Sequence, residues 1–116
     1  MKAELVSFGV LEIDNKQYRF DVVIDNGAIG QRDKTASRKR QREFGHTPLT
    51  PEENIPWNCT TLLIGSGAYG RLPITDDFHS EAKKRGVTLI IDLTKEICKK
   101  LAADPPHTNA ILHCTC

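Results

Sequence analysis

A glycine-rich segment in the middle of the chain has the spacing of a nucleotide-binding loop. Gly65-Ser66-Gly67-Ala68-Tyr69-Gly70 follows the apolar run Thr61–Ile64, and Asp92 lies near the distance at which dinucleotide-binding folds keep a ribose-binding acid. In those folds the glycines open a helix whose N-terminus faces the pyrophosphate. Here residues 71–74 separate the glycines from Thr75, the first residue that could cap a helix, and only 24 residues follow Asp92. We therefore predict no dinucleotide site.

Two interpretations of this glycine loop, residues 65–70, stay open. It is either a turn that lets the strand leave the sheet sharply, or a concavity of backbone N–H groups that holds a small anion. Loops at the carboxyl ends of strands are frequent ligand sites in α/β proteins. The histidine before Thr47-Pro48 could face the same cavity. The candidate ligand-binding residues are therefore Gly65, Ser66, Gly67, Gly70, Arg71 and His46.

Other patterns that could support catalysis or metal binding are incomplete. Ser66 lacks the G-x-S-x-G pattern of a nucleophile elbow, and no pair of carboxylates has a spacing typical of glycosidases. His113-Cys114-Thr115-Cys116 offers soft metal ligands, but no second C-x-x-C or H-x-x-H group completes a set of four. We therefore predict no catalytic residue, no metal site and no cofactor.

A basic run carries most of the local charge. Residues 32–42 hold six basic residues against one acid on a chain whose formal net charge is +1. No aromatic ladder, zinc-finger or RNA-recognition signature accompanies the run, so we expect no nucleic-acid partner. The segment is either a solvated surface loop or a contact for phosphate or an acidic protein surface. Its candidate interaction residues are Arg38, Lys39, Arg40 and Arg42.

The elements that must position these residues begin with antiparallel strands. Alternating apolar residues predict a strand over 6–13 with an irregularity at Gly9, and a second strand over 18–24. Asp14-Asn15-Lys16 joins them as a hairpin. Residues 30–45 contain almost no apolar residue and predict a long exposed loop. Thr50-Pro51-Glu52-Glu53 has the pattern of a capping box that opens a single helical turn.

The second half of the chain alternates strands with helices. The runs 61–64, 87–91 and 108–114 predict three strands, of which the first two are fully buried. Thr75 and Thr94 are the expected N-caps of the two intervening helices, and Gly86 is the expected end of the first. The predicted core contains Leu63, Ile64, Val87, Leu89, Ile91, Ile97, Leu101, Ile111 and Leu112.

Length and composition fit one globular domain over residues 1–116, with a basic polar loop at about 30–45. Of the 116 residues, 39% are apolar and 27% charged, which excludes disordered and fibrous classes. No apolar run approaches the roughly 20 residues of a membrane span, and the N-terminus lacks the apolar segment of a secretory signal. We expect a cytoplasmic protein with reduced cysteines. The element order predicts an α/β (mixed α+β) fold of three layers, whose central mixed sheet combines an N-terminal hairpin with a βαβαβ unit.

Three segments together resemble one protein family. They are Leu62–Leu72, Glu81–Val87 and the closing Ala110–Cys116. The family comprises small single-domain α/β proteins and includes a mitochondrial respiratory complex I assembly factor and an adipogenesis-associated domain protein. The residues Gly27–Gly30 and His46-Thr47-Pro48 fit it less closely.

This resemblance implies a three-layer fold with a central mixed sheet and no established enzyme mechanism. It marks Gly65, Gly67 and Arg71 as glycine-loop positions and His46 as a loop histidine. The family carries aromatic and acidic residues where this chain has the basic residues 34–42, so the basic loop is a feature of this protein.

Two functions from different classes are left open, with a nucleic-acid role as a weaker third. The first is a non-enzymatic interaction or assembly module with a protein partner, as a monomer or a homodimer. The alternative is a protein, or an enzyme, that binds an anion or phosphate on the glycine loop. A ligand site requires a cavity of roughly 300 Å³ or more beside that loop, whereas an interaction module requires an exposed patch.

Overall fold

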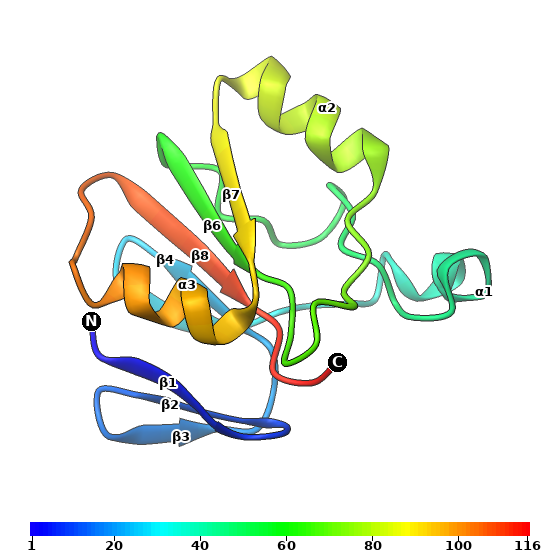
Figure 1. The fold of residues 1–116 in the computed structure, drawn as a ribbon. Helices are drawn as coiled ribbons and strands as arrows, with labels where there is room; N and C mark the ends of the chain where they lie inside the picture. Colours follow the sequence, from blue (N-terminus) through cyan, green and yellow to red (C-terminus); the bar gives the residue numbers. More distant parts are fainter.

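Turn residues divide the first 31 residues into five short strands. The computed structural model describes all residues 1–116, and its first sheet contains β1 (Ala3–Ser7), β2 (Val10–Ile13) and β3 (Lys16–Tyr18) in antiparallel order (Figure 1). Asp14-Asn15 forms the predicted turn between β2 and β3, with φ of 49° and 71°. The single strand predicted over 6–13 is wrong, because Gly9 adopts φ +84° and the chain reverses there.

A five-stranded mixed sheet forms the centre of the molecule. Its strand order is β5 (Ala28–Gln31), β4 (Val22–Asp25), β8 (Thr108–Leu112), β6 (Thr61–Gly65) and β7 (Thr88–Asp92). Strands β6, β7 and β8 are parallel, while β4 runs antiparallel to both β5 and β8. The strand predicted over 18–24 is therefore split, because β3 stays in the small sheet and β4 pairs in the central one. The predicted α/β class with a central mixed sheet is confirmed.

Two helices cover opposite faces of this sheet and complete the βαβαβ unit. Helix α2 (Asp76–Arg85) begins at the predicted cap, where Thr75 Oγ1 accepts from Phe78 N–H, and ends at Gly86. Helix α3 (Thr94–Leu101) is confirmed as a helix, but the predicted cap is wrong: Leu93 is the N-cap residue and Thr94 is the first helical residue. The Thr94 hydroxyl instead donates to the His113 carbonyl and accepts from Gly67 N–H, so it ties the glycine loop to the end of β8.

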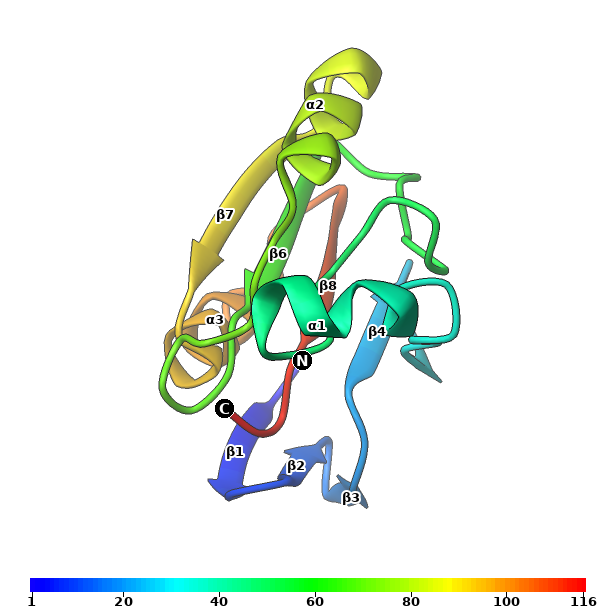
Figure 2. The same cartoon turned by 90° about the vertical axis from the view of Figure 1, so that its right-hand side faces the viewer.

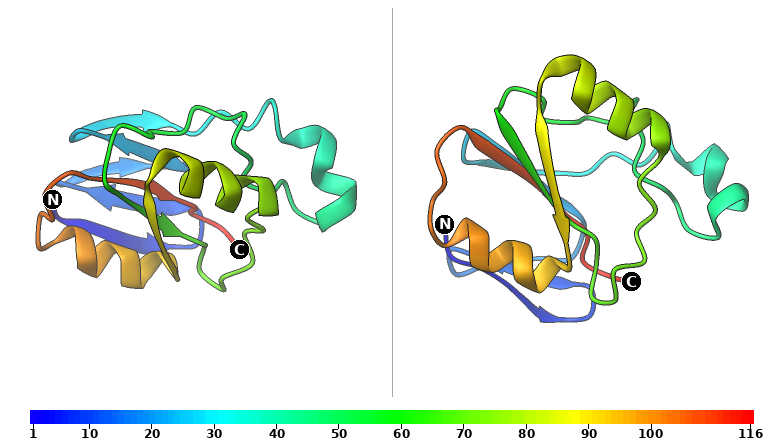
Figure 3. Two further views of the ribbon diagram at one scale, coloured as in Figure 1. Left: turned by 90° about the horizontal axis from the view of Figure 1, so that it is seen from above. Right: turned by 45° about the horizontal axis from the view of Figure 1, so that its top comes forward.

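The core has two parts, one on each face of the central sheet. On one face α3 and the small sheet pack together, with Leu11 and Ile13 against Leu63 and Ile97 (Figure 3). On the other face Phe78 of α2 packs against alternate residues of the strands. None of the helices has the length and apolar character needed to cross a membrane.

Most of the predicted core is buried, but strand β7 is not. Leu89 is only half-buried, and Ile90 and Ile91 are 37% and 39% exposed. The prediction of a buried strand here is wrong because β7 is the last strand of the sheet and pairs only with β6.

The basic segment 30–45 contains short helical elements and is not a loop throughout. It contains a single 3₁₀ turn, η1 (Arg38–Arg40), and the short helix α1 (Gln41–Phe44), which lie at the front of Figure 2, outside the sheets. Arg32 and Ser37 are buried, so the prediction of exposure throughout is wrong at these two residues. At residues 50–53 the chain forms a turn without a helix, although Glu53 accepts from Thr50 N–H as a capping box requires.

Candidate functional site

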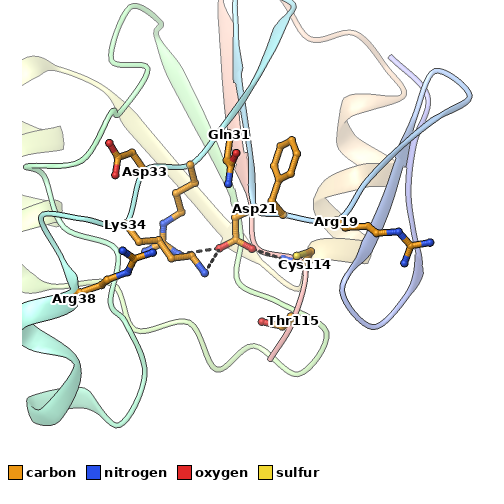
Figure 4. Close-up of a pocket in the computed structure, with 10 residues that line it drawn as sticks. Arg19, Asp21, Gln31, Asp33, Lys34, Arg38, Cys114 and Thr115 are labelled. Carbon is orange, nitrogen blue, oxygen red and sulfur yellow. Dashed lines mark hydrogen bonds and ion pairs between the residues drawn. The ribbon is translucent and has the colours of Figure 1, made fainter.

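A pocket of about 510 Å³ opens at one end of the strands of the central sheet, where β4 begins and where β5 and β8 end (Figure 4). The parallel strands β6 and β7 also end on this side of the sheet, and the carboxyl ends of parallel strands are a common position for ligands in α/β folds. Ten residues line the pocket: Arg19, Phe20, Asp21, Gln31, Arg32, Asp33, Lys34, Arg38, Cys114 and Thr115.

The buried carboxylate Asp21 lies at the bottom of the pocket, and we call Asp21 and the buried residues paired with it the pocket floor. Its Oδ2 accepts from Arg32 Nη1 at 2.9 Å and from His113 Nδ1 at 2.7 Å, and its Oδ1 accepts from Cys114 N–H at 2.9 Å. The Lys34 ammonium lies 3.5 Å from the same Oδ2. Burial raises the pKa of the Asp21 carboxyl, but the hydrogen bonds and positive charge around it outweigh burial and hold that pKa well below its usual value. Asp21 is therefore ionised in the folded protein.

Arg32 links this floor to a second buried carboxylate. Its guanidinium donates to Glu53 at 2.7 and 3.0 Å and to the Pro48 carbonyl at 2.9 Å, in addition to Asp21. Burial lowers the pKa of Arg32, whereas its hydrogen bonds and ion pairs with the two carboxylates raise it above its ordinary value. The Ser37 hydroxyl donates to Glu53 as well. A buried ion network of this kind is stable only when each charge is fully hydrogen-bonded, and no buried side-chain nitrogen or oxygen here lacks a partner.

His113 joins this network to the pocket wall. Its Nδ1 contacts Asp21, and its Nε2 lies 3.2 Å from Thr115 Oγ1. Thr115 is half-buried and lines the pocket. The two side chains therefore lie on the same side of the chain just after β8.

Lys34 and Arg38 bring positive charge to the mouth of the pocket. Figure 4 shows both side chains reaching toward Asp21 from the same side, while Arg19 extends on the opposite side. The Arg38 and Arg19 side chains are exposed and form no ion pair. The pocket therefore presents cationic side chains to a ligand, while the buried charges of Asp21 and Arg32 beneath them are already paired.

The glycine loop serves this site indirectly. The amides of Ala68, Tyr69 and Arg71 donate to the Thr115 and Cys116 carbonyl oxygens at 2.7–3.2 Å. The amides of Ser66 and Gly67 donate to the Asp92 carbonyl and the Thr94 hydroxyl. These amides cannot form the predicted anion-binding concavity without breaking those bonds. The loop holds the C-terminal segment, including Thr115, against the pocket.

The other predicted site residues are dispersed. Arg71 is exposed and His46 is half-buried; neither lines the pocket, and the His46 side chain makes no hydrogen bond with the glycine loop. Of the basic segment, only Arg38 of the four candidates lines the pocket. Arg40 forms an ion pair with Asp77 at 3.2 Å, while Lys39 and Arg42 are exposed.

Sequence analysis missed the residues that build the floor. Asp21 and Arg32 were given no role of their own, and His113 was considered only as a metal ligand. One signal was available: the capping-box pattern singled out Glu53, whose carboxylate does accept from Thr50 N–H and also binds Arg32.

No protein-family model and no curated protein matches the chain. Among solved structures, the conserved hypothetical protein PH1505 from Pyrococcus horikoshii OT3 is 32% identical over 100% of both chains, with a TM-score of 0.83. The chain belongs to the family of PH1505. That membership fixes the fold and assigns no activity.

Two more distant structures share the fold alone. MT938 is 23% identical, with a TM-score of 0.68 over 98% of this chain and 97% of its own. A protein described as an outer membrane protein from Bartonella henselae is 15% identical, with a TM-score of 0.64 over 98% and 96% of the two chains. The fold of the PH1505 family therefore occurs in chains of little sequence similarity.

Proposed function

We propose that the protein binds a small anionic molecule, with a carboxylate or phosphate group, in the pocket above Asp21. The observation that carries this proposal is the position of Lys34 and Arg38, whose side chains both line one pocket, while Arg38 forms no ion pair. The pocket volume of about 510 Å³ lies in the range of small-molecule sites. Anion binding is the alternative that the sequence left open, here with side-chain cations in place of glycine-loop amides.

A thermal-shift titration at low ionic strength tests this function. Phosphate, sulfate, succinate and citrate are added at millimolar concentration, and a ligand that binds only the folded state raises the melting temperature. Arg38→Gln and Lys34→Gln are expected to reduce that rise. Lys39→Gln is the matched control, because Lys39 neighbours Arg38 in η1 but does not line the pocket. No shift with any anion, or an equal loss in Lys39→Gln, would refute the proposal.

A second candidate function, a protein-interaction module, has an observation of its own. Phe8 and Tyr69 are 56% and 69% exposed, and their rings lie 6.2 Å apart between the β1–β2 turn and the glycine loop. Exposed aromatic pairs are typical of protein-binding sites. The resemblance to the family that includes a complex I assembly factor supports this candidate.

Photo-crosslinking tests the interaction surface. A benzophenone amino acid at position 69 is expected to give one discrete crosslinked protein, and the same probe at Glu52, an exposed residue outside this pair, is expected to give none. Equal crosslinking at both positions would contradict an interaction surface at Phe8 and Tyr69.

A further inference from the structure

We propose that Thr115, His113 and Asp21 form a nucleophile–base–acid relay that hydrolyses esters whose acyl part carries an anionic group. The inference rests on the proposed anion-binding function, because the pocket cations would hold that anionic group. It adds a reaction to a site for which the sequence predicts no catalytic residue.

The hydrogen-bond geometry sets the imidazole in the state that a general base requires. An ionised Asp21 can only accept, so His113 Nδ1 carries the proton in their 2.7 Å contact. In the neutral ring Nε2 is then an acceptor, and the group 3.2 Å from it is the Thr115 hydroxyl. A carboxylate, an imidazole and a hydroxyl in this order form the relay by which hydrolases on unrelated folds activate a hydroxyl.

The surrounding contacts fix each member of the relay. Asp21 is held by Arg32 and by the Cys114 amide, and the His113 carbonyl accepts from the Thr94 hydroxyl. The Thr115 carbonyl accepts from Ala68 N–H at 2.7 Å. The glycine loop also passes so close to the imidazole that a Cβ at position 67 would lie 2.9 Å from His113 Cδ2. The relay is therefore held from three sides by segments distant in sequence.

Thr115 lines the pocket, and Lys34 brings positive charge into the same pocket. Thr115 and Asp21 both line the pocket, and Lys34 contacts the same Asp21 oxygen as His113. The neighbouring Cys114 is a poor nucleophile, because burial and the Asp21 charge raise the pKa of its thiol to about 12.

The chemistry proceeds in two balanced steps. Thr115 Oγ1 bonds to the ester carbonyl carbon, its proton passes to His113 Nε2, and the carbon–oxygen bond to the alcohol breaks as that proton moves to the leaving alcohol. Water then attacks the Thr115 ester, gives one proton to His113, and releases the carboxylic acid as the proton returns to Thr115 Oγ1. The sum is ester plus water giving acid plus alcohol.

The mono-p-nitrophenyl ester of succinic acid is the probe and neutral p-nitrophenyl acetate the comparison. Each rate is taken above the spontaneous hydrolysis of that ester without protein, because the succinate carboxylate attacks its own ester. We expect release of p-nitrophenolate, an acyl adduct in the intact mass that maps to Thr115, and a preference for the succinyl ester. Thr115→Val keeps the side-chain shape and is expected to lose the adduct and at least about 100-fold in rate. Thr115→Ser is expected to restore both. Thr47→Val, a half-buried threonine outside the pocket, is the control with unchanged rate.

The outcomes separate this inference from the binding proposal. Hydrolysis of the probe by Thr115→Val at the wild-type rate, or an adduct on another residue, would overturn the relay. Failure of both esters to react, while succinate still raises the melting temperature, would overturn the relay and leave anion binding standing. Acylation of Thr115 with no preference for the succinyl ester would support the relay and count against the anion site.

Discussion

At the scale of single residues, Asp21 is the side chain on which most buried contacts of the pocket meet. Its carboxyl pKa lies well below the ordinary value of 3.8, so the stability that it contributes is fully present above that pH and is lost as the pH falls below it. We expect Asp21→Asn to lower the free energy of unfolding at neutral pH by about 3 kcal/mol, because it leaves Arg32 and His113 incompletely paired.

Urea unfolding across the acidic range measures this contribution. Between about pH 5 and pH 3 the wild-type protein is expected to lose more stability than Asp21→Asn, which has no carboxylate left to protonate. Asp25→Asn, at an exposed residue of β4 without an ion pair, should follow the wild-type curve. Parallel curves for wild type and Asp21→Asn would contradict the assignment of Asp21 as an ionised anchor.

The cysteines give a second prediction at this scale. Burial raises the pKa of the Cys98 thiol to about 11 and that of Cys114 to about 12, the charges of Glu4 and Asp21 adding to the effect. At about pH 8 both thiols should resist iodoacetamide in the folded protein, while half-exposed Cys116 reacts. Peptide mass mapping checks this, with all four cysteines reacting in denaturant. Modification of Cys114 as fast as Cys116 would show that the end of β8 opens readily.

At the scale of elements, the glycine loop is a clamp for the C-terminal segment. Gly67 has φ +107°, and a Cβ there would lie 2.3 Å from the Cys116 carbonyl carbon. We expect Gly67→Ala to cost at least about 2 kcal/mol, from backbone strain together with displacement of that segment. Gly27→Ala is the matched control: Gly27 also has positive φ, at +82°, but its added Cβ would meet nothing within 4 Å.

Chemical denaturation of these two variants separates strain from close contact. Gly27→Ala should lose only the strain energy, about 1 kcal/mol. Gly67→Ala should lose more and should also weaken anion binding, because Thr115 belongs to the displaced segment. Equal losses in the two variants would mean that the contact with Cys116 contributes nothing.

The elements that could be predicted are those whose signals are local in sequence. Thr75 and Gly86 set the ends of α2 through contacts within one turn, and both were found. The exposure of Ile91 could not be found, because a run of apolar residues does not reveal which strand lies at the edge of a sheet. Gly9 was recognised as an irregularity, but the reversal there depends on the small sheet and on its N–H bond to the Cys114 carbonyl.

At the scale of the whole molecule, the two sheets share one core. Leu11 of the small sheet is fully buried against Ile97 and Leu63, so we expect Leu11→Ala to cost about 2–5 kcal/mol. Trp57 reports from the opposite face of the central sheet, where it packs on Phe78. Because the two sheets share one core, unfolding of Leu11→Ala followed by Trp57 fluorescence and by far-UV circular dichroism should give one coincident transition, as in the wild-type protein. Separate transitions would show that the small sheet unfolds independently.

The site itself could not be predicted, because its members meet only in the complete fold. Asp21, Arg32, Glu53 and His113 come from four separate segments, and nothing in the spacing of these residues pairs a carboxylate near the N-terminus with a histidine near the C-terminus. The sequence analysis placed its candidate site at the carboxyl end of β6, on the glycine loop, and the pocket opens at the same end of the parallel strands but is lined by other residues. The central carboxylate of the site, Asp21, immediately precedes the antiparallel strand β4, and the pairing of β4 with β8 was not predicted.

The position of β8 between β4 and β6 has a consequence for how the chain folds. The β4–β5 hairpin and the β6–β7 pair have no hydrogen bonds to each other and are joined only through β8, which follows all other elements in the sequence. During synthesis, both halves of the sheet leave the ribosome before the strand that unites them. Closure therefore depends on contacts between residues distant in sequence, such as Asp21 and His113, which are 92 positions apart, and this favours slow folding. Until β8 inserts, β4 and β6 each present an unpaired edge to other chains, and this nascent stage is where aggregation competes with folding.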